Sequence, residues 1–163
     1  DPGMAFGTGT HPTTVLSLKA LEKYIQKGDI VLDVGSGSGI LSIATSLLGA
    51  EHVYSYDLDE VAVKSTKANR DLNHLTDKIS VSQNDLLKNV QQKANVIVSN
   101  ILAEILLLLI DDAWNNLYDG GYFITSGIIT KKQKLVETKL KEKGFKIVET
   151  KTDDDWVSIV AQK

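Results

Sequence analysis

One short stretch, residues 29–39, constrains the fold of this chain more than any other. Its first half is an apolar run, Ile30 to Val34, interrupted by a single carboxylate at Asp33, and its second half places glycine at positions 35, 37 and 39. An apolar run of this length bounded by glycine is typical of a strand buried on both faces. The apolar, proline-free segment that follows, residues 40–49, predicts a helix. Strand, glycine turn and helix form the first unit of a nucleotide-binding α/β sheet.

Strand and helix patterns alternate along the rest of the chain. A helix is expected from an N-cap at Thr13 or Thr14 to Tyr24. Further helices are expected at residues 59–73, 102–117 and 131–143, and further strands at 51–57, 78–83, 94–99, 122–126, 145–150 and 156–161. Such alternation predicts a parallel sheet covered on both faces. Because no helix separates the last two strands, one of them is expected to run antiparallel to the others. The predicted fold is a Rossmann-like α/β fold with a seven-stranded, mostly parallel sheet, an antiparallel terminal strand and helices on both faces.

Composition narrows the classes of function. The chain has 163 residues, no cysteine and a formal net charge of −3. The lack of cysteine excludes disulfides, thiolate metal sites and a cysteine nucleophile, and the charge gives no reason to expect direct nucleic-acid binding. The most apolar window, residues 101–110, is too short to span a membrane, and no signal peptide is apparent. We expect one domain over residues 1–163 that acts in the cytoplasm as a monomer.

The beginning of the chain has an unusual composition. Both prolines and three glycines fall within its first twelve residues, and no initiator region is apparent. Such a segment is typical of a functional loop, so the chain is interpreted as a fragment of a longer protein.

Glycine spacing separates the candidate cofactors. A dinucleotide fingerprint requires Gly-x-Gly-x-x-Gly, which would place a third glycine at position 40, where this chain has Ile40. A phosphate loop of the Walker type requires Gly-Lys-Ser/Thr, which is absent. The observed acid-x-Gly-x-Gly-x-Gly resembles the first motif of class I S-adenosylmethionine-dependent methyltransferases, whose cofactor carries no pyrophosphate. Dinucleotide binding and a purely structural turn remain the alternatives.

Polar side chains follow four of the predicted strands, where ligands of such sheets bind: Asp57, Asn84-Asp85, Asn100 and Ser126-Gly127. Asp57 could accept hydrogen bonds from both ribose hydroxyls, or it could be a solvated or helix-capping acid. Asp85 is placed where methyltransferases commonly contact the adenine amino group, or it is a plain loop acid. Asn100 ends an apolar strand where amino-directed methyltransferases carry Asn or Asp, and its carbonyl could orient a nitrogen nucleophile; the alternative is a helix cap.

Three segments together point to a family. Residues 3–14, Gly-Met-Ala-Phe-Gly-Thr-Gly-Thr-His-Pro-Thr-Thr, with residues 32–41 and Asn100-Ile101-Leu102-Ala103, resemble the ribosomal protein L-eleven methyltransferase family over nearly the whole chain. The resemblance implies a class I methyltransferase fold, S-adenosyl-L-methionine as cofactor, S-adenosyl-L-homocysteine as product, and no metal. It also implies transfer of methyl groups to lysine side chains and the N-terminal amine of one ribosomal protein, the expected partner.

The resemblance further implies which residues contact the cofactor. The family's positions match Thr14, Gly35, Asp57 and Asn100, with Gly37 in the same turn, and the Phe6-Gly7-Thr8 segment of a covering loop (residues 1–14) is expected over the cofactor. Asn100 is assigned as the catalytic, orienting group. Family members normally carry a smaller substrate-recognition domain before this one, which this chain lacks. The chain is therefore expected to bind cofactor but to act weakly, or not at all, on its protein substrate.

The remaining candidates have simpler interpretations. His11 could be a base, although the resemblance favours a role in loop structure. His52 and His74 show no metal-ligand spacing. The lysine-rich helix at 131–143 is expected to be a solvated face rather than a phosphate site, and Asp153 to Asp155 a hairpin tip rather than a cation site. A methyltransferase acting on RNA or a small molecule, an NAD-dependent dehydrogenase and a non-catalytic cofactor-binding module remain as alternative functions.

Overall fold

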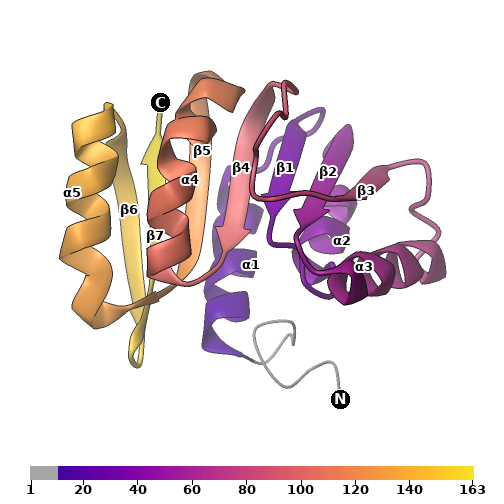
Figure 1. Ribbon diagram of the computed structural model, residues 1–163, viewed down its shortest axis with the longest axis horizontal. Coiled ribbons are helices and arrows are strands. Elements are labelled where there is room, and N and C mark those ends of the chain that lie inside the picture. The colour runs from indigo at the N-terminus through magenta and orange to yellow at the C-terminus, as the bar shows by residue number, and fades with distance from the viewer. Residues whose placement is uncertain (1–10) are drawn as a thin grey trace.

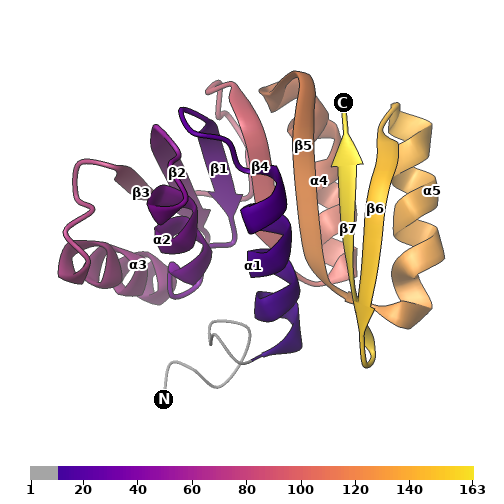
Figure 2. The ribbon, with the colours of Figure 1, turned by 180° about the vertical axis from the view of Figure 1, so that it is seen from behind.

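The computed structural model describes residues 11–163, which form a seven-stranded sheet in the order β3-β2-β1-β4-β5-β7-β6 (Figures 1 and 2). The strands are β1 (Ile30–Val34), β2 (His52–Asp57), β3 (Ile79–Gln83), β4 (Ala94–Asn100), β5 (Leu117–Ile129), β6 (Lys146–Asp153) and β7 (Trp156–Gln162). The helices are α1 (Pro12–Tyr24), α2 (Ile40–Leu47), α3 (Glu60–Leu72), α4 (Ala103–Asn116) and α5 (Gln133–Lys143), with a 3₁₀ turn, η2 (Thr130–Lys132), before α5.

The strand directions confirm the predicted fold class. Strands β3, β2, β1, β4 and β5 pair in parallel, whereas β7 runs antiparallel to both β5 and β6. The chain moves outward from β1 in one direction through β2 and β3, then crosses to β4 on the other side of β1. At such a reversal the loops after the two central strands diverge and leave a crevice at their carboxyl ends.

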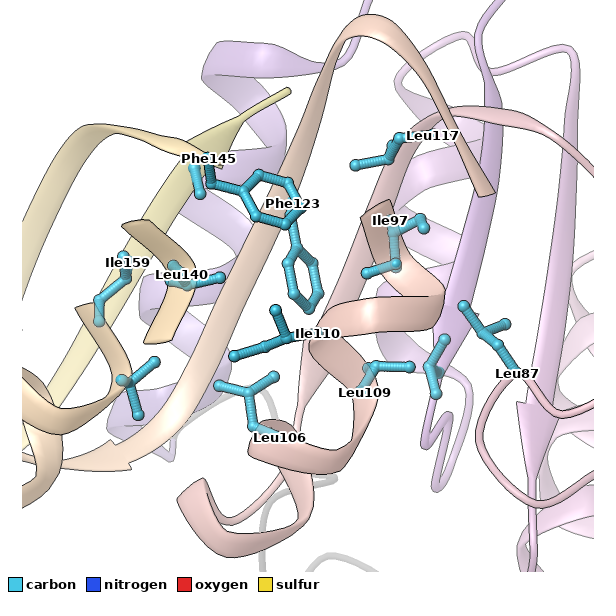
Figure 3. Close-up of a cluster of buried hydrophobic side chains, with 14 of the residues drawn as sticks. Leu87, Ile97, Leu106, Leu109, Ile110, Leu117, Phe123, Leu140, Phe145 and Ile159 are labelled. Carbon is cyan, nitrogen blue, oxygen red and sulfur yellow. The ribbon is translucent and has the colours of Figure 1, made fainter. Parts of the chain in front are cut away.

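Helices cover both faces of the sheet. Helices α4 and α5 lie in front of β4 to β7 in Figure 1, and α1 and α2 lie on the opposite face, seen in Figure 2. In Figure 3, Leu106, Leu109 and Ile110 of α4 point toward Phe123 and Ile97 on the sheet, and all five are buried. A second core cluster joins α1 and α2 to the other side of the same strands. Two buried faces explain why the central strands are apolar runs rather than alternating patterns.

Several boundaries differ from those expected. Strand β6 runs to Asp153 rather than ending at residue 150, so Asp153 belongs to the strand and not to the hairpin tip. Helix α1 begins at Pro12, before the expected cap at Thr13 or Thr14, because the side chain of His11 caps it by accepting a hydrogen bond from the backbone N–H of Thr13 at 3.2 Å. Residues 12–14 therefore belong to a helix rather than to the expected loop. Strand β5 is much longer than residues 122–126 because its first residues also pair, with Gly120 and Gly121 bonded to the backbone of Lys163.

No helix described in residues 11–163 is long and apolar enough to cross a bilayer.

Candidate active site

The glycine turn after β1 is held from several sides. The backbone N–H groups of Gly35 and Ser36 donate to the carbonyl of Tyr56 at 2.8 and 3.1 Å. From α3, the Thr66 hydroxyl donates to the carbonyl of Gly37 at 2.9 Å, and the Asn69 amide donates to that of Ser38 at 2.7 Å. The protein's own hydrogen bonds from β2 and α3 therefore hold the turn in place.

Two of the glycines in this turn are required for different reasons. Gly35 has φ +82°, and a Cβ built on it would lie 2.6 Å from Cγ2 of Ile101. Gly37 has φ +57°, and a Cβ there would meet no atom within 4 Å. Side chains rarely adopt these backbone angles. At Gly37 the backbone consequently faces open space in which a ligand could approach it closely.

Asp57 lies beside this turn at the end of β2. Its Oδ2 accepts a hydrogen bond from the backbone N–H of Gly37 at 2.9 Å, and its Oδ1 accepts one from that of Asp59 at 3.0 Å. Each carboxylate oxygen can accept a further hydrogen bond. Asp57 can therefore bind two neighbouring hydroxyl groups while it still holds the glycine turn in place.

A cavity of about 310 Å³ opens at this edge of the sheet. Its polar residues are Asp57, Asn84 and Asp85, and its other lining residues are Val34, Gly35, Tyr56, Leu58, Leu86, Ile101, Ile105 and Leu108. Asp85 forms an exposed ion pair with Lys88 at 2.9 Å. A carboxylate pair beside an apolar wall matches the chemistry of a nucleoside, with hydroxyls at one end and a flat ring at the other.

Asn100 ends β4 on the opposite side of the turn and is 8% exposed. Its Nδ2 donates to Oγ1 of Thr13 at 3.2 Å. Its Oδ1 is buried and has no hydrogen-bond partner among the residues that the structure describes. An unpaired buried carbonyl costs about 1–3 kcal/mol, and this one is explained if it accepts a hydrogen bond from a ligand.

The resemblance also names residues near the start of the chain. Thr14 is fully buried in the first turn of α1, and its backbone N–H donates to the carbonyl of His11 at 3.0 Å. It directly follows Thr13, which contacts Asn100. Phe6, Gly7 and Thr8 lie outside the described residues.

Asp33 is a fully buried carboxylate on β1. Burial raises its pKa to about 7, against the opposing effect of the Ser42 hydroxyl, which donates to Asp33 Oδ2 at 2.6 Å. Its Oδ1 has no partner among residues 11–163. The motif acid therefore lies behind the glycine turn, in the polar layer between β1 and α2, and does not line the cavity.

The other candidates lie apart from this site. Within the described part of the chain, no group of three or more His, Asp or Glu side chains could hold a metal ion. His52 bonds to the hydroxyl of Ser80 at 2.7 Å on the far half of the sheet. Lysines of α5 form exposed ion pairs, as Lys143 does with Asp111 at 3.3 Å. Asp153 to Asp155 are exposed at the β6–β7 hairpin.

Some contacts of the site go beyond the expectations. Thr13, expected only as a helix cap, contacts Asn100. Gly127, expected among the strand-end residues, lies beside Asn100, and a Cβ there would be 2.9 Å from Oδ1 of Asn100. The apolar wall of the cavity, Leu58, Leu86, Ile105 and Leu108, includes side chains that remain exposed. A leucine directly after a strand-end acid, as Leu58 follows Asp57, is the sequence signal that could have identified this wall.

Comparison with solved structures supports the fold and the family. A ribosomal protein L11 methylase from Lactobacillus delbrueckii subsp. bulgaricus superposes with a TM-score of 0.93 and 37% identity, over 100% of this chain and 83% of that one. A T. thermophilus 16S rRNA methyltransferase, solved with AdoMet and guanosine, superposes with a TM-score of 0.81 and 23% identity, over 98% of this chain and 45% of that one. The second similarity shows the fold alone.

Sequence comparison is more specific. The family model described as ribosomal protein L11 methyltransferase (PrmA) matches residues 1–163. Curated proteins of that name from Oceanobacillus iheyensis and Bacillus subtilis are 61% and 56% identical over 163 residues, all of this chain and 52% of each relative. This chain therefore spans about half the length of those relatives. Because the family model covers every residue, the chain belongs to the ribosomal protein L11 methyltransferase family.

Proposed function

We propose that this chain is the cofactor-binding and catalytic part of an S-adenosyl-L-methionine-dependent protein methyltransferase. Its substrate would be ribosomal protein L11, methylated on lysine side chains and on the N-terminal amine. The observation that carries the proposal is the buried Oδ1 of Asn100, which has no partner in residues 11–163 and lies at the same sheet edge as the cavity lined by Gly35 and Asp57. We further propose that the protein acts in the cytoplasm as a monomer.

The residues present fit the cofactor. Asp57 would bind the ribose hydroxyls, the Gly35–Gly37 backbone would allow close approach, and the apolar wall would hold the adenine ring with Asp85 at its edge. Thr14 and the Phe6–Thr8 segment would contact it from the start of the chain. When bound, S-adenosyl-L-methionine would supply a methyl group activated by its positively charged sulfur: an N–C bond to a neutral amine would form as the S–C bond breaks, which leaves S-adenosyl-L-homocysteine and a protonated methylamine.

The protein's own part in the reaction is to prepare and align the amine. A free lysine side chain has a pKa of about 10.4 and is protonated at neutral pH, and desolvation in a closed site favours its neutral form. Asn100 Oδ1 can accept a hydrogen bond from the N–H of that neutral amine. This contact orients the nitrogen lone pair, and orientation of two reactants is a large part of the rate enhancement in a direct transfer.

Two measurements test this function. A thermal-shift screen should show stabilisation by S-adenosyl-L-methionine and S-adenosyl-L-homocysteine, and none by NAD; stabilisation by NAD alone would favour a dehydrogenase. Transfer of methyl groups from labelled cofactor to ribosomal protein L11 tests the reaction. Cofactor binding without any release of S-adenosyl-L-homocysteine would instead indicate a binding module, and labelling of RNA rather than protein would indicate a different substrate.

Asn100→Ala tests the role of the orienting carbonyl. Turnover should fall about tenfold or more because the amine loses its partner, whereas the cofactor Kd should change by less than about threefold. If cofactor affinity fell as far as turnover, Asn100 would serve mainly to shape the cofactor site.

A further inference from the structure

Asn100 is useful as a hydrogen-bond acceptor only in one of the two orientations of its side-chain amide. The carbonyl oxygen and the amide nitrogen have nearly the same shape, so packing alone distinguishes them poorly. Turned by 180°, the same side chain would present N–H donors to an amine that needs an acceptor. Something in the structure must therefore select the orientation.

The contact that selects it comes from the first turn of α1. Nδ2 of Asn100 donates to the hydroxyl oxygen of Thr13 at 3.2 Å. Thr13 is fully buried, and the same hydroxyl oxygen lies 2.8 Å from Nδ1 of His11. A hydroxyl carries one proton, so the orientation of Asn100 depends on where that proton points.

The backbone N–H of Thr13 determines where the hydroxyl proton points. The N–H of Thr13 can only donate, and it donates to Nδ1 of His11 at 3.2 Å as part of the cap of α1. In the neutral imidazole, a ring nitrogen that accepts carries no proton, so the proton of this His11 tautomer is on Nε2. Nδ1 can then only accept from the Thr13 hydroxyl as well. The hydroxyl proton is thereby directed to His11, and its oxygen is left to accept from Asn100.

We infer that Thr13, supported by His11, is a positioning residue that holds the Asn100 amide with Oδ1 facing the substrate amine. The inference rests on the proposed methyl transfer to an amine and adds to it how the acceptor carbonyl is kept in the reactive orientation. Thr13 acts through Asn100 and itself needs no contact with the substrate. His11 acts in this chain of hydrogen bonds as an acceptor and not as a general base.

Substitution of Thr13 provides the kinetic test, in the full-length protein. Thr13→Val keeps the shape and removes the hydroxyl, and should lower kcat about tenfold or more while the cofactor Kd stays within about twofold. Thr13→Ser keeps the hydroxyl and should restore kcat to within about threefold of wild type. The matched control is Thr45→Val, which removes a fully buried hydroxyl on α2 that has no partner among the described residues and should leave both constants unchanged.

A spectroscopic measurement on the cofactor-free protein tests the contact without any assay of activity. With ¹⁵N-labelled asparagine, the Asn100 side-chain amide signal, assigned by its loss in Asn100→Asp, should shift in Thr13→Val but not in Thr13→Ser or Thr45→Val. An unchanged signal or unchanged kcat in Thr13→Val would overturn the inference, as would the absence of rescue by serine. A wild-type protein that transfers no methyl group to any amine would instead overturn the proposed function.

Discussion

Asp57 holds the glycine turn and, in the proposed function, binds the ribose hydroxyls. In Asp57→Asn, the new side-chain amide group would face one of the two backbone N–H groups that donate to the carboxylate. The substitution also removes the charge that would strengthen hydrogen bonds to ribose. Hydrogen bonds to charged groups contribute about 1.5–3 kcal/mol, so the cofactor Kd should rise roughly ten- to hundredfold by calorimetry. Asp59→Asn makes the same charge change two positions along, but asparagine caps α3 as well as aspartate does. Equal losses in both variants would show a general charge effect.

Asp33 should leave a signature in the pH dependence of stability. Its pKa lies at about 7 in the folded protein against 3.8 ordinarily, because burial disfavours the charged form. Between these two pH values the unfolded chain has released a proton that the folded chain retains, so the free energy of unfolding should fall as pH rises from about 4 to about 7, by roughly 4 kcal/mol in all. Above pH 7 this contribution is constant.

Denaturant unfolding of Asp33→Asn at several pH values checks this sign. The variant should lack the decline, so its stability relative to wild type should increase from pH 4 to pH 7. Asp77→Asn, at an exposed position, should keep the wild-type profile. A parallel decline in wild type and Asp33→Asn would mean that another group is responsible.

At the scale of elements, β5 carries a distortion that shapes the site. Its pairing with β7 shifts register between Thr125 and Ile128, which leaves Ser126 and Gly127 as a bulge. Gly127 has φ +85°, and a Cβ there would lie 2.6 Å from the carbonyl oxygen of Ile101 and 2.9 Å from Oδ1 of Asn100. Bulges beside active sites commonly redirect side chains in this way.

Gly127→Ala should therefore destabilise the folded protein by more than backbone strain alone would. Gly120, on the same strand, has φ +84° but open space around its Cβ position, so Gly120→Ala should cost only the strain of about 1–2 kcal/mol. Gly127→Ala should lose at least about 2 kcal/mol more in denaturant unfolding, because backbone must move, and should also lower kcat by displacing Asn100. Equal losses in the two variants would contradict the close contact.

Local sequence patterns predict helices and strands, whereas contacts between side chains far apart in the chain leave no such pattern. The order and type of the elements were predictable because glycine turns and apolar periodicity are local signals. The start of α1 was not, because a histidine side chain caps it. The contact between Thr13 and Asn100 joins residues far apart in the chain, and no periodic pattern encodes a side-chain hydrogen bond. The long first part of β5 was missed because Gly120 and Gly121 resemble a turn.

At the scale of the whole molecule, the site exists because the sheet reverses its order beside β1. That reversal brings the end of β2, the end of β4 and the start of α1 to one edge, although they come from separate parts of the chain. Helix α1 is fixed at its other end, where the Tyr24 hydroxyl donates to Glu149 at 2.6 Å, and this bond together with Lys23 lowers the pKa of Glu149 to about 2. Helix α1 is thus held by contacts at both of its ends.

This arrangement predicts how cofactor binding and protein recognition divide along the longer relatives. The cavity is lined by residues between Val34 and Leu108, so residues 1–163 should bind S-adenosyl-L-methionine with a Kd within about threefold of that of the Oceanobacillus iheyensis relative, of which this chain covers 52%. A specific protein interface requires about 800 Å² per partner. Because the matched segment is 52% of the relative, we expect part of the surface that recognises ribosomal protein L11 to lie outside it. The kcat/KM toward ribosomal protein L11 should therefore be at least about tenfold lower for residues 1–163, a difference of about 1.4 kcal/mol or more.

Truncating the relative to its matching 163 residues separates the effect of length from that of sequence. Equal kcat/KM for the truncated and complete relative would place substrate recognition within this fold itself.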